Sequence, residues 1–324
     1  MKIFITGASG FIGHRLTEQL VAEGHEVNAL IRQPQATDLP DNICIYKGDI
    51  TDEKVVHKAM QGCEQVYHIA GYAKLWAPTR KTFYDINVSA TKNVLEAARR
   101  HGVQKLVYTS SCAVFGPSLK TPLTESDPRI TAYDHDYDLS KQLAENMVRG
   151  YARQGLPAVI VNPSRVYGPG PVTHANMITK MLIACLKGRP VLMPGIPHVI
   201  GNYAFVEDVV NCHILAMKHG RSGERYIAGG ENLTYADVIA IVKEKVGKTR
   251  LLPLPASAVK TWGYLQLLKH QLTGAPPAFT PEAAQRYLQN AAFDCSKAIN
   301  ELGYQVTSFR EGIQKTIQHI KLAL

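Results

Sequence analysis

The chain has 324 residues, 45% of them hydrophobic, and a mean hydropathy of -0.11, values that are ordinary for a globular protein. No apolar run approaches the roughly eighteen residues of a membrane span, and the six cysteines form no metal-ligand or disulfide pattern, so we expect no membrane partner and no metal. The net charge of +9 is spread along the chain instead of gathered in basic blocks, which argues against nucleic-acid binding.

The first thirteen residues predict a short buried strand, Lys2–Thr6, followed by a glycine-rich turn and a helix. In the spacing Gly-x-x-Gly-x-x-Gly, Gly7 and Gly10 let the backbone approach a pyrophosphate, and Gly13 lets the helix lie close to the strand. The helix start adds free N–H groups and the positive end of its dipole. We therefore predict a dinucleotide site, with an ordinary glycine turn as the alternative. A strand this early also leads us to expect no targeting peptide and a cytoplasmic protein.

Strand and helix patterns alternate through the first half of the chain and then give way to Pro- and Gly-rich connections. This predicts an α/β fold, a Rossmann-type doubly wound parallel sheet with a smaller mixed α/β C-terminal substrate lobe. We assign residues 1–165 to the dinucleotide-binding domain, with a return segment at about 202–230, and residues 166–201 and 231–324 to the lobe. The expected strands are residues 2–6, 26–32, 43–48, 65–70, 105–109 and 158–162, and the expected helices 14–23, 54–60, 88–101, 140–154 and 235–246.

The end of the second expected strand indicates which dinucleotide would bind. An NAD-binding turn has a carboxylate about twenty residues after the glycines, where it holds the ribose 2′-hydroxyl. This chain has Ile31 and Arg32 there, and a guanidinium can pair with a 2′-phosphate in fork geometry. The sequence therefore predicts NADP, unless Arg32 is one more solvent-facing cation. Asp49, after the third strand, would meet the adenine edge or cap the next helix.

Two hydroxyl groups, those of Ser110 and Ser111, follow the expected strand 105–109, where the carboxyl end of a strand faces a ligand cleft. Tyr137 and Lys141 are four residues apart at an expected helix start, hence one turn apart on one face. A fixed ammonium would lower the pKa of the phenol toward the range of a general acid, and Ser111 would donate to a carbonyl oxygen. A Tyr-x-x-x-Lys pair alone is mostly an exposed helix pair. Its order after the glycine turn and the serines indicates an oxidoreductase.

These motifs resemble those of the extended short-chain dehydrogenases/reductases, a family that includes dihydroflavonol reductases, 3β-hydroxysteroid dehydrogenases and nucleotide-sugar epimerases and dehydratases. The resemblance spans nearly the whole chain and is closest to the dihydroflavonol-reductase-like branch. One departure is Gly116, where plant flavonoid reductases have an asparagine, so we do not expect a flavonoid substrate. The family pattern is visible in residues 6–13, 48–50, 66–70, 87–95, 137–141, 162–170, 205–209, 296–298 and 301–304.

The resemblance implies roles for single residues. Ser111, Tyr137 and Lys141 would be the catalytic trio, and a homodimer would form through the helices expected at 88–101 and 140–154. Taken on its residue type alone, Asn87 would be a helix-start cap. The residues implied to bind the cofactor are Gly7, Ser9, Gly10, Phe11, Ile12, Gly13, Arg32, Asp49, Ile50, Ala70, Asn87, Tyr137, Lys141, Pro163 and Ser164.

The function favoured by the sequence is an NADP-dependent reduction of a ketone or aldehyde, with Tyr137 as proton donor. One alternative is a nucleotide-sugar epimerase or dehydratase that recycles its cofactor within each turnover, and a second is a non-catalytic cofactor-sensing protein. Arg32 argues against the first, because such enzymes mostly hold NAD through an acid. The Ser111/Tyr137/Lys141 set argues against the second, since a sensor needs no tuned phenol.

Three segments, 72–78, 191–199 and 259–272, are expected to line the substrate pocket, and their aromatic residues and leucines predict a fairly apolar substrate. For 259–272, a membrane-surface or partner helix is the alternative. His68, within an apolar strand, is expected to be a core histidine with satisfied hydrogen bonds. A nucleotide-sugar enzyme would need converging arginines, for which the candidates are Arg189, Arg221, Arg225 and Arg250.

Overall fold

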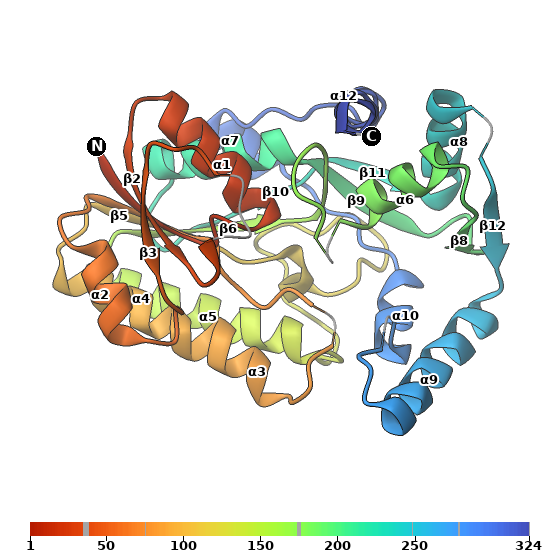
Figure 1. The fold of residues 1–324 in the computed structure, drawn as a ribbon, viewed down its shortest axis with the longest axis horizontal. Coiled ribbons are helices and arrows are strands. Elements are labelled where there is room, and N and C mark those ends of the chain that lie inside the picture. Colours follow the sequence, from red (N-terminus) through yellow and green to blue (C-terminus); the bar gives the residue numbers. More distant parts are fainter. Residues whose placement is uncertain (35–38, 75, 174–175, 248, 278, 324) are drawn as a thin grey trace.

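The computed structural model describes residues 1–34, 39–74, 76–173, 176–247, 249–277 and 279–323. The larger part of the molecule is built around a twisted parallel sheet (Figure 1). Within these ranges seven strands lie in the order β10-β6-β5-β4-β1-β2-β3, and each neighbouring pair is parallel. The strand order reverses between β1 and β4, where the carboxyl ends of parallel strands open a crevice. The strands are β1 (Lys2–Thr6), β2 (Glu26–Ile31), β3 (Ile43–Lys47), β4 (Gln65–His68), β5 (Lys105–Thr109), β6 (Ala158–Pro163) and β10 (Arg225–Ala228).

Both faces of the sheet are buried, which explains the near-continuous apolar runs of its strands. In β1, Ile3 and Ile5 pack toward one face and Phe4 toward the other, because successive side chains of a strand point in opposite directions. The first face is covered by α1 (Phe11–Ala22), α7 (Val206–His219) and α11 (Ser296–Leu302), and the second by α2 (Glu53–Met60), α4 (Ala90–Arg100) and α5 (Asp136–Arg153) (Figure 1).

The predicted Rossmann-type fold is confirmed, and the differences lie at helix ends. Helix α1 starts at Phe11 instead of residue 14, because the carbonyl of Gly10 already accepts from His14 N at 2.8 Å. Helix α5 starts at Asp136 instead of residue 140, which puts Tyr137 in its first turn. The helix expected at 88–101 is part of a longer helical stretch, which comprises α3 (Lys81–Tyr84), a π-helical turn (Asp85–Ser89) and α4.

The smaller lobe is a mixed α/β unit, as predicted. Its aromatic core includes Tyr167, Tyr203 and Phe309, with the ring of Phe309 centred 4.9 Å from that of Tyr167 and 5.2 Å from that of Tyr203. These rings hold together a three-stranded sheet and three helices. The elements are β7 (Arg165–Tyr167), β9 (Ile200–Phe205), β11 (Glu231–Thr234), the parallel pair β8 (Val191–Pro194) and β12 (Leu251–Leu254), α6 (Met177–Leu186), α8 (Tyr235–Val246) and α12 (Phe309–Ala323).

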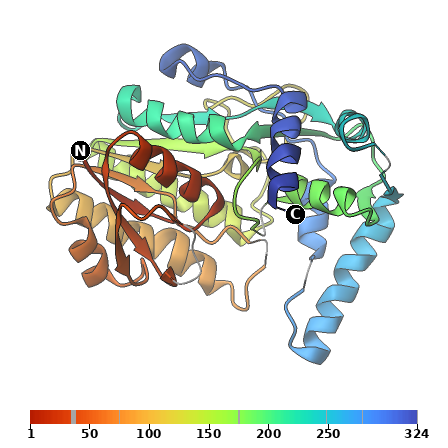
Figure 2. The ribbon, with the colours of Figure 1, turned by 45° about the horizontal axis from the view of Figure 1, so that its top comes forward.

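Helix α9 (Ala256–Thr273) extends away from the rest of the molecule and packs on α10 (Pro281–Tyr287) (Figure 2). The two helices meet closely because Gly263 has no side chain, and a Cβ there would lie 2.7 Å from Pro281 N. No helix in the described part of the chain is long and apolar enough to cross a membrane. The large side chains of α9 that face solvent are Trp262, Tyr264, Leu265, Leu268 and Leu272.

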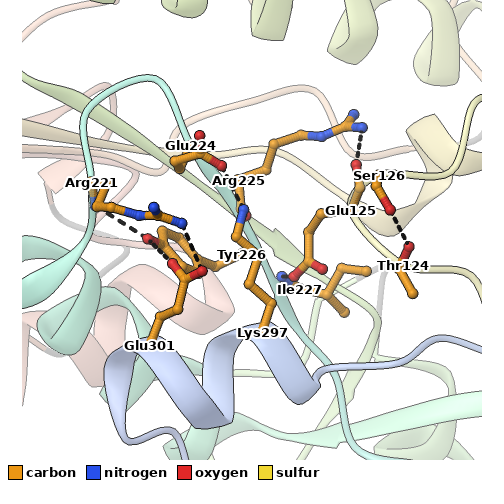
Figure 3. Close-up of polar contacts among 10 residues, drawn as sticks. All are labelled: Thr124, Glu125, Ser126, Arg221, Glu224, Arg225, Tyr226, Ile227, Lys297 and Glu301. Carbon is orange, nitrogen blue, oxygen red and sulfur yellow. Dashed lines mark hydrogen bonds and ion pairs between the residues drawn. The ribbon is translucent and has the colours of Figure 1, made fainter.

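Strand β10 returns from the C-terminal half and is held by the side chains of Glu125 and Lys297, which come from two other segments of the chain (Figure 3). Glu125 Oε1 accepts from the backbone N–H of Ile227 at 2.7 Å. Lys297, on α11, donates to Glu224 Oε2 at 2.6 Å and to the carbonyl oxygen of Arg225 at 3.0 Å. These groups border a cavity of about 470 Å³. Lys297 and Glu224 neutralise each other at the amino end of β10. We therefore interpret this network as one that holds β10 in place and not as a ligand site.

This packing refines the proposed domain limits. The return segment begins with α7 at Val206, since β9 belongs to the three-stranded sheet of the lobe. Helix α11 and Tyr304 pack with the core beneath α1 and α7, so this part of 231–324 belongs with the dinucleotide-binding domain. The rest of the division into residues 1–165 and a substrate lobe stays a proposal.

His68 is the core histidine that the sequence predicted. It is 0% exposed in β4, with Nδ1 2.7 Å from Thr6 Oγ1 and Nε2 3.0 Å from Thr91 Oγ1. Burial, helped by the nearby Lys141 ammonium, lowers the pKa of His68 to about 3. The imidazole therefore stays neutral in the folded protein over the whole range in which an unfolded histidine gains its proton.

We expect this histidine to make the protein less stable in acid. The folded pKa lies below the unfolded value near 6.5, so the free energy of unfolding falls as the pH drops from about 6.5 toward 3. The slope from one such group is on the order of 1.4 kcal/mol per pH unit. Urea unfolding of wild type and of His68→Gln at pH 7.5, 6 and 5 should give a smaller slope for the variant. His213, whose pKa burial lowers to about 4, retains part of it. Equal slopes would contradict the assignment.

Candidate active site

The glycine turn has the close backbone approaches that a diphosphate site needs. Gly7 has φ of 77°, and a Cβ on it would lie 2.6 Å from Ala70 N, while a Cβ on Gly13 would overlap the carbonyl oxygen of Gly7. Gly10 N donates to Gly7 O at 2.9 Å and closes the turn. No side chain caps α1. Its first N–H groups therefore point toward the crevice without a side-chain partner.

The other predicted turn residues occupy the start of α1. Ser9 is exposed, and Phe11 and Ile12 are the first two helical residues, whose N–H groups have no partner within a helix. The ring of Phe11 is buried, and a Cβ on Gly170 would lie 3.2 Å from it. The turn thus offers backbone donors, and the apolar side chains fix their direction.

Arg32 and Asp49 lie beside each other just beyond β2 and β3. Arg32 Nε is 3.9 Å from Asp49 Oδ2, and the Arg32 side chain is 72% exposed. Asp49 Oδ1 accepts from the N–H and the hydroxyl of Thr51 at 2.9 and 2.8 Å, whereas Asp52 caps α2. The alternative that Asp49 caps this helix is therefore wrong. Ile50 between them is buried. This edge leaves a guanidinium free to meet a phosphate.

Asn87 lies inside the π-helical turn Asp85–Ser89, not at a helix start, so its interpretation as a cap is wrong. Its Oδ1 accepts from Tyr72 N at 2.7 Å, and its Nδ2 donates to Ser140 Oγ at 2.9 Å. Ala70 N donates to Thr6 Oγ1 at 3.2 Å. Since π turns often occur at functional sites, the extra residue here serves to aim Asn87 at the loop after β4.

Ser111, Tyr137 and Lys141 come together at the carboxyl end of β5. The side chain of Ser111 lies beside the phenol of Tyr137. Lys141 Nζ donates to the carbonyl oxygen of Thr109 at 2.6 Å. The neighbouring Ser110 is buried, and its Oγ has no partner within the described residues. Ser111 is therefore the serine that lies beside Tyr137, and its catalytic role stays a prediction.

Burial shifts the pKa values of Tyr137 and Lys141. It raises the pKa of Tyr137, and the hydrogen bond from Ser111 and the charge of Arg286 act against the rise. It lowers the pKa of Lys141 to about 7, with Glu145 opposing. The phenol pKa is thus raised and not lowered, unlike the sequence expectation. Near neutral pH Tyr137 holds its proton, as a proton donor must.

One arginine at the site, Arg286, was missed in the sequence. Its guanidinium lies 5.7 Å from the ring centroid of Tyr137, and its Nη1 is 2.9 Å from Asp138 Oδ1. It reaches the trio from α10, almost 150 positions later in the chain, so no spacing in the sequence could indicate it. The pair fixes the start of α5, where Tyr137 lies.

The cleft beside Ser111 is lined by a mixture of apolar and polar or charged residues, whereas the sequence predicted an apolar pocket. It includes Pro163 and Ser164 at the end of β6, and the Oγ of Ser164 is buried without a partner in the described chain. None of the three expected pocket segments borders it within the described residues, and residue 75 of segment 72–78 lies outside them. Its polar lining includes Arg129, Asp134, His135, Asp138, Arg165, Glu282, Gln285, Arg286, Gln289 and Asn290.

The four arginines proposed for a nucleotide sugar do not converge here. Arg225 pairs with Glu145 at 3.3 Å and Arg221 with Glu301 at 2.7 Å. Arg189 and Arg250 are exposed. The arginines that do border the cleft are Arg129, Arg165 and Arg286.

Comparison with known proteins identifies the family of this chain. The model of the NAD dependent epimerase/dehydratase family matches residues 3–229. A putative dihydroflavonol 4-reductase of Synechocystis sp. is 30% identical over 334 residues, which cover 97% of this chain and 93% of that protein. Sterol demethylase protein B of Methylococcus capsulatus is 30% identical over 96% of this chain and 95% of that one. The UDP-glucose 4-epimerase of Thermus thermophilus, in complex with NAD, superimposes with a TM-score of 0.82 at 26% identity over 100% of both chains.

The chain belongs to the NAD dependent epimerase/dehydratase family, the extended short-chain dehydrogenases/reductases. It is an NAD(P)-dependent enzyme, and the proteins to which it is similar include ones named as oxidoreductases and as an epimerase. The resemblance predicted from the motifs is thereby confirmed.

Proposed function

We propose that this enzyme uses NADPH to reduce a ketone or aldehyde to an alcohol. The observation that carries the proposal is Arg32, an exposed guanidinium beyond β2, at the position where an NAD-type site has a carboxylate. Its Nε approaches Asp49 only to 3.9 Å, so the fork of the guanidinium is open to a 2′-phosphate. In a net reduction, NADPH gives up its hydride to the substrate and leaves the enzyme as NADP after each turnover. An enzyme that recycles its cofactor would keep it bound instead.

In this proposal the glycine turn and the start of α1 hold the diphosphate of the cofactor. Ala70 and Asn87 lie near its phosphates and ribose, and Pro163 and Ser164 lie against the nicotinamide. The bound cofactor supplies the hydride. Tyr137 donates the proton to the carbonyl oxygen, and Ser111 donates a hydrogen bond to the same oxygen as negative charge builds up. Lys141 stabilises the tyrosinate that is left behind.

The relatives divide between the reductase and its main alternative. Those named a putative dihydroflavonol 4-reductase and a 3-beta-hydroxysteroid dehydrogenase support net redox chemistry. A relative named UDP-N-acetyl-alpha-D-glucosaminuronate decarboxylase, 30% identical over 71% of this chain, supports a nucleotide-sugar substrate. The charged side chains in the lining of the cleft also suit that alternative better than a wholly apolar lining would. A homodimer and a cytoplasmic location stay predictions.

The first prediction concerns the proton donor. Tyr137→Phe should lower kcat at least about a hundredfold, the lower range for loss of a general acid, and leave NADPH affinity nearly unchanged. Ser111→Ala should lower kcat more than Ser110→Ala, because only one hydroxyl can lie at the developing oxyanion and Ser111 is the serine beside Tyr137. Steady-state kinetics and cofactor fluorescence titration measure both effects. Near-wild-type turnover by Tyr137→Phe would refute the role.

The second prediction concerns the choice of cofactor. Losing a charge-assisted phosphate contact costs about 1.5–3 kcal/mol, so Arg32→Ala should weaken NADPH binding roughly ten- to a hundredfold. NADH affinity should barely change. Titration of NADPH and NADH against the variant and against wild type gives the four dissociation constants that are compared. The proposal fails if the two cofactors lose affinity equally.

The third prediction concerns the reaction type. We expect the protein to consume NADPH with some members of a panel of aromatic and aliphatic aldehydes and ketones, followed by loss of absorbance. Parallel incubations with UDP- and GDP-sugars should give no isomer. Conversion of a nucleotide sugar without net NADPH loss, together with inactivity toward every carbonyl, would establish the epimerase alternative.

A further inference from the structure

The cleft beside Ser111 contains a positive charge that the protein itself does not neutralise. Arg165, the first residue of β7, is partly buried, and its Nη1 donates to the hydroxyls of Tyr203 at 3.4 Å and Tyr235 at 3.3 Å. Within the described residues no carboxylate forms an ion pair with it. The other two arginines of the cleft differ in this respect, since Arg129 and Arg286 both approach Asp138, at 3.8 and 2.9 Å.

The surroundings of Arg165 hold its guanidinium in a defined place. The rings of Tyr203, Tyr235 and Tyr287 surround it, with centroids 5.7, 5.9 and 5.6 Å away. A Cβ on Gly201 would overlap Nη1, so the glycine provides the space that the guanidinium occupies. A cation held by neutral aromatic groups is preorganised for an anion, because it loses little freedom on binding.

The chain also connects this charge to the reacting centre. Asn162, three residues before Arg165, donates from its side chain to the carbonyl oxygen of Ser111 at 3.2 Å. Arg165 borders the same cleft as Ser111, and so does His135, whose Nε2 is buried with no partner in the described chain. Polar groups left without partners in a cleft indicate that a ligand supplies them.

We propose that Arg165 is an anion-binding subsite, which holds a carboxylate or phosphate group of the substrate while its carbonyl group lies against Ser111. This deepens the proposed function and rests on it for the carbonyl half. It assigns the substrate to the class of acidic carbonyl compounds, in place of the apolar class expected from the sequence. Arg165 acts in substrate binding and not in proton transfer.

The test compares substrates that differ only in the anionic group. The pairs are 4-carboxybenzaldehyde with its methyl ester, for a carboxylate, and glyceraldehyde 3-phosphate with glyceraldehyde, for a phosphate. We expect kcat/KM to be higher for the charged member of at least one pair. Arg165→Gln should lower it roughly ten- to a hundredfold for that member, mainly through KM, and leave the neutral member nearly unchanged.

Three further variants separate charge, geometry and simple misfolding. Arg165→Lys keeps the charge without the fork, and Gly201→Ala keeps the arginine but displaces it, so both should show part of the loss. Arg189→Gln removes an exposed charge and should leave the preference unchanged. Equal losses for both members of a pair in Arg165→Gln, or no preference in wild type, would overturn the subsite.

Direct binding makes the test independent of turnover. Wild type and Arg165→Gln are titrated calorimetrically with benzoate and with inorganic phosphate, at saturating NADPH so that the dinucleotide site is filled. Binding that disappears in the variant supports the subsite, even if no carbonyl of the panel is reduced and the reductase proposal fails. Reduction of neutral carbonyls, with no anion binding or with equal binding to both proteins, overturns the subsite alone.

Discussion

The close approach of α1 to β1 is the constraint on which the rest of this site depends. Gly13 lies against the carbonyl of Gly7, and Gly7 lies against the backbone of Ala70 in the loop that follows β4, with no room for a side chain at either glycine. The end of β1, this loop and the start of α1 therefore meet at one point of the crevice. The loop that holds Ala70 and the position of Ser111 follow from that point, because β4 and then β5 lie beside β1 in the sheet and these residues come just after the ends of those strands.

Features that depend on nearest neighbours in the chain could be predicted from the sequence. The apolar runs such as Ile3–Ile5 require burial on both faces, which specifies a parallel sheet. The glycine turn and the pair Tyr137 and Lys141 lie within one or two turns of chain. Their positions agree with the prediction to within a few residues. The errors at helix ends arise where backbone groups, as at Gly10, cap a helix without a side-chain signal.

Features built from distant segments could not be predicted in this way. Arg286 reaches Tyr137 from α10, and Tyr203, Tyr235 and Tyr287 surround Arg165 from three separate elements. The π-helical turn at Asn87 adds one residue to a helix that otherwise has an ordinary periodicity. The apolar character of 259–272 was visible, but only packing shows that much of it faces solvent on α9 instead of the cleft. The composition of these segments therefore correctly indicated apolar residues in the lobe, but it could not show which residues of the lobe line the cleft beside Ser111.

The return of α11 to the main sheet has a consequence for how such chains can be recombined. Lys297 reaches the backbone of Arg225, and Leu302 and Tyr304 complete the core under α7. Cutting the chain after residue 230 would thus remove part of the foundation of the nucleotide-binding half together with the lobe. A chimera that exchanges substrate lobes therefore needs crossovers on both sides of Ser296–Leu302. The lobe is not a separate C-terminal block, because a helix of the nucleotide-binding half interrupts it in the sequence.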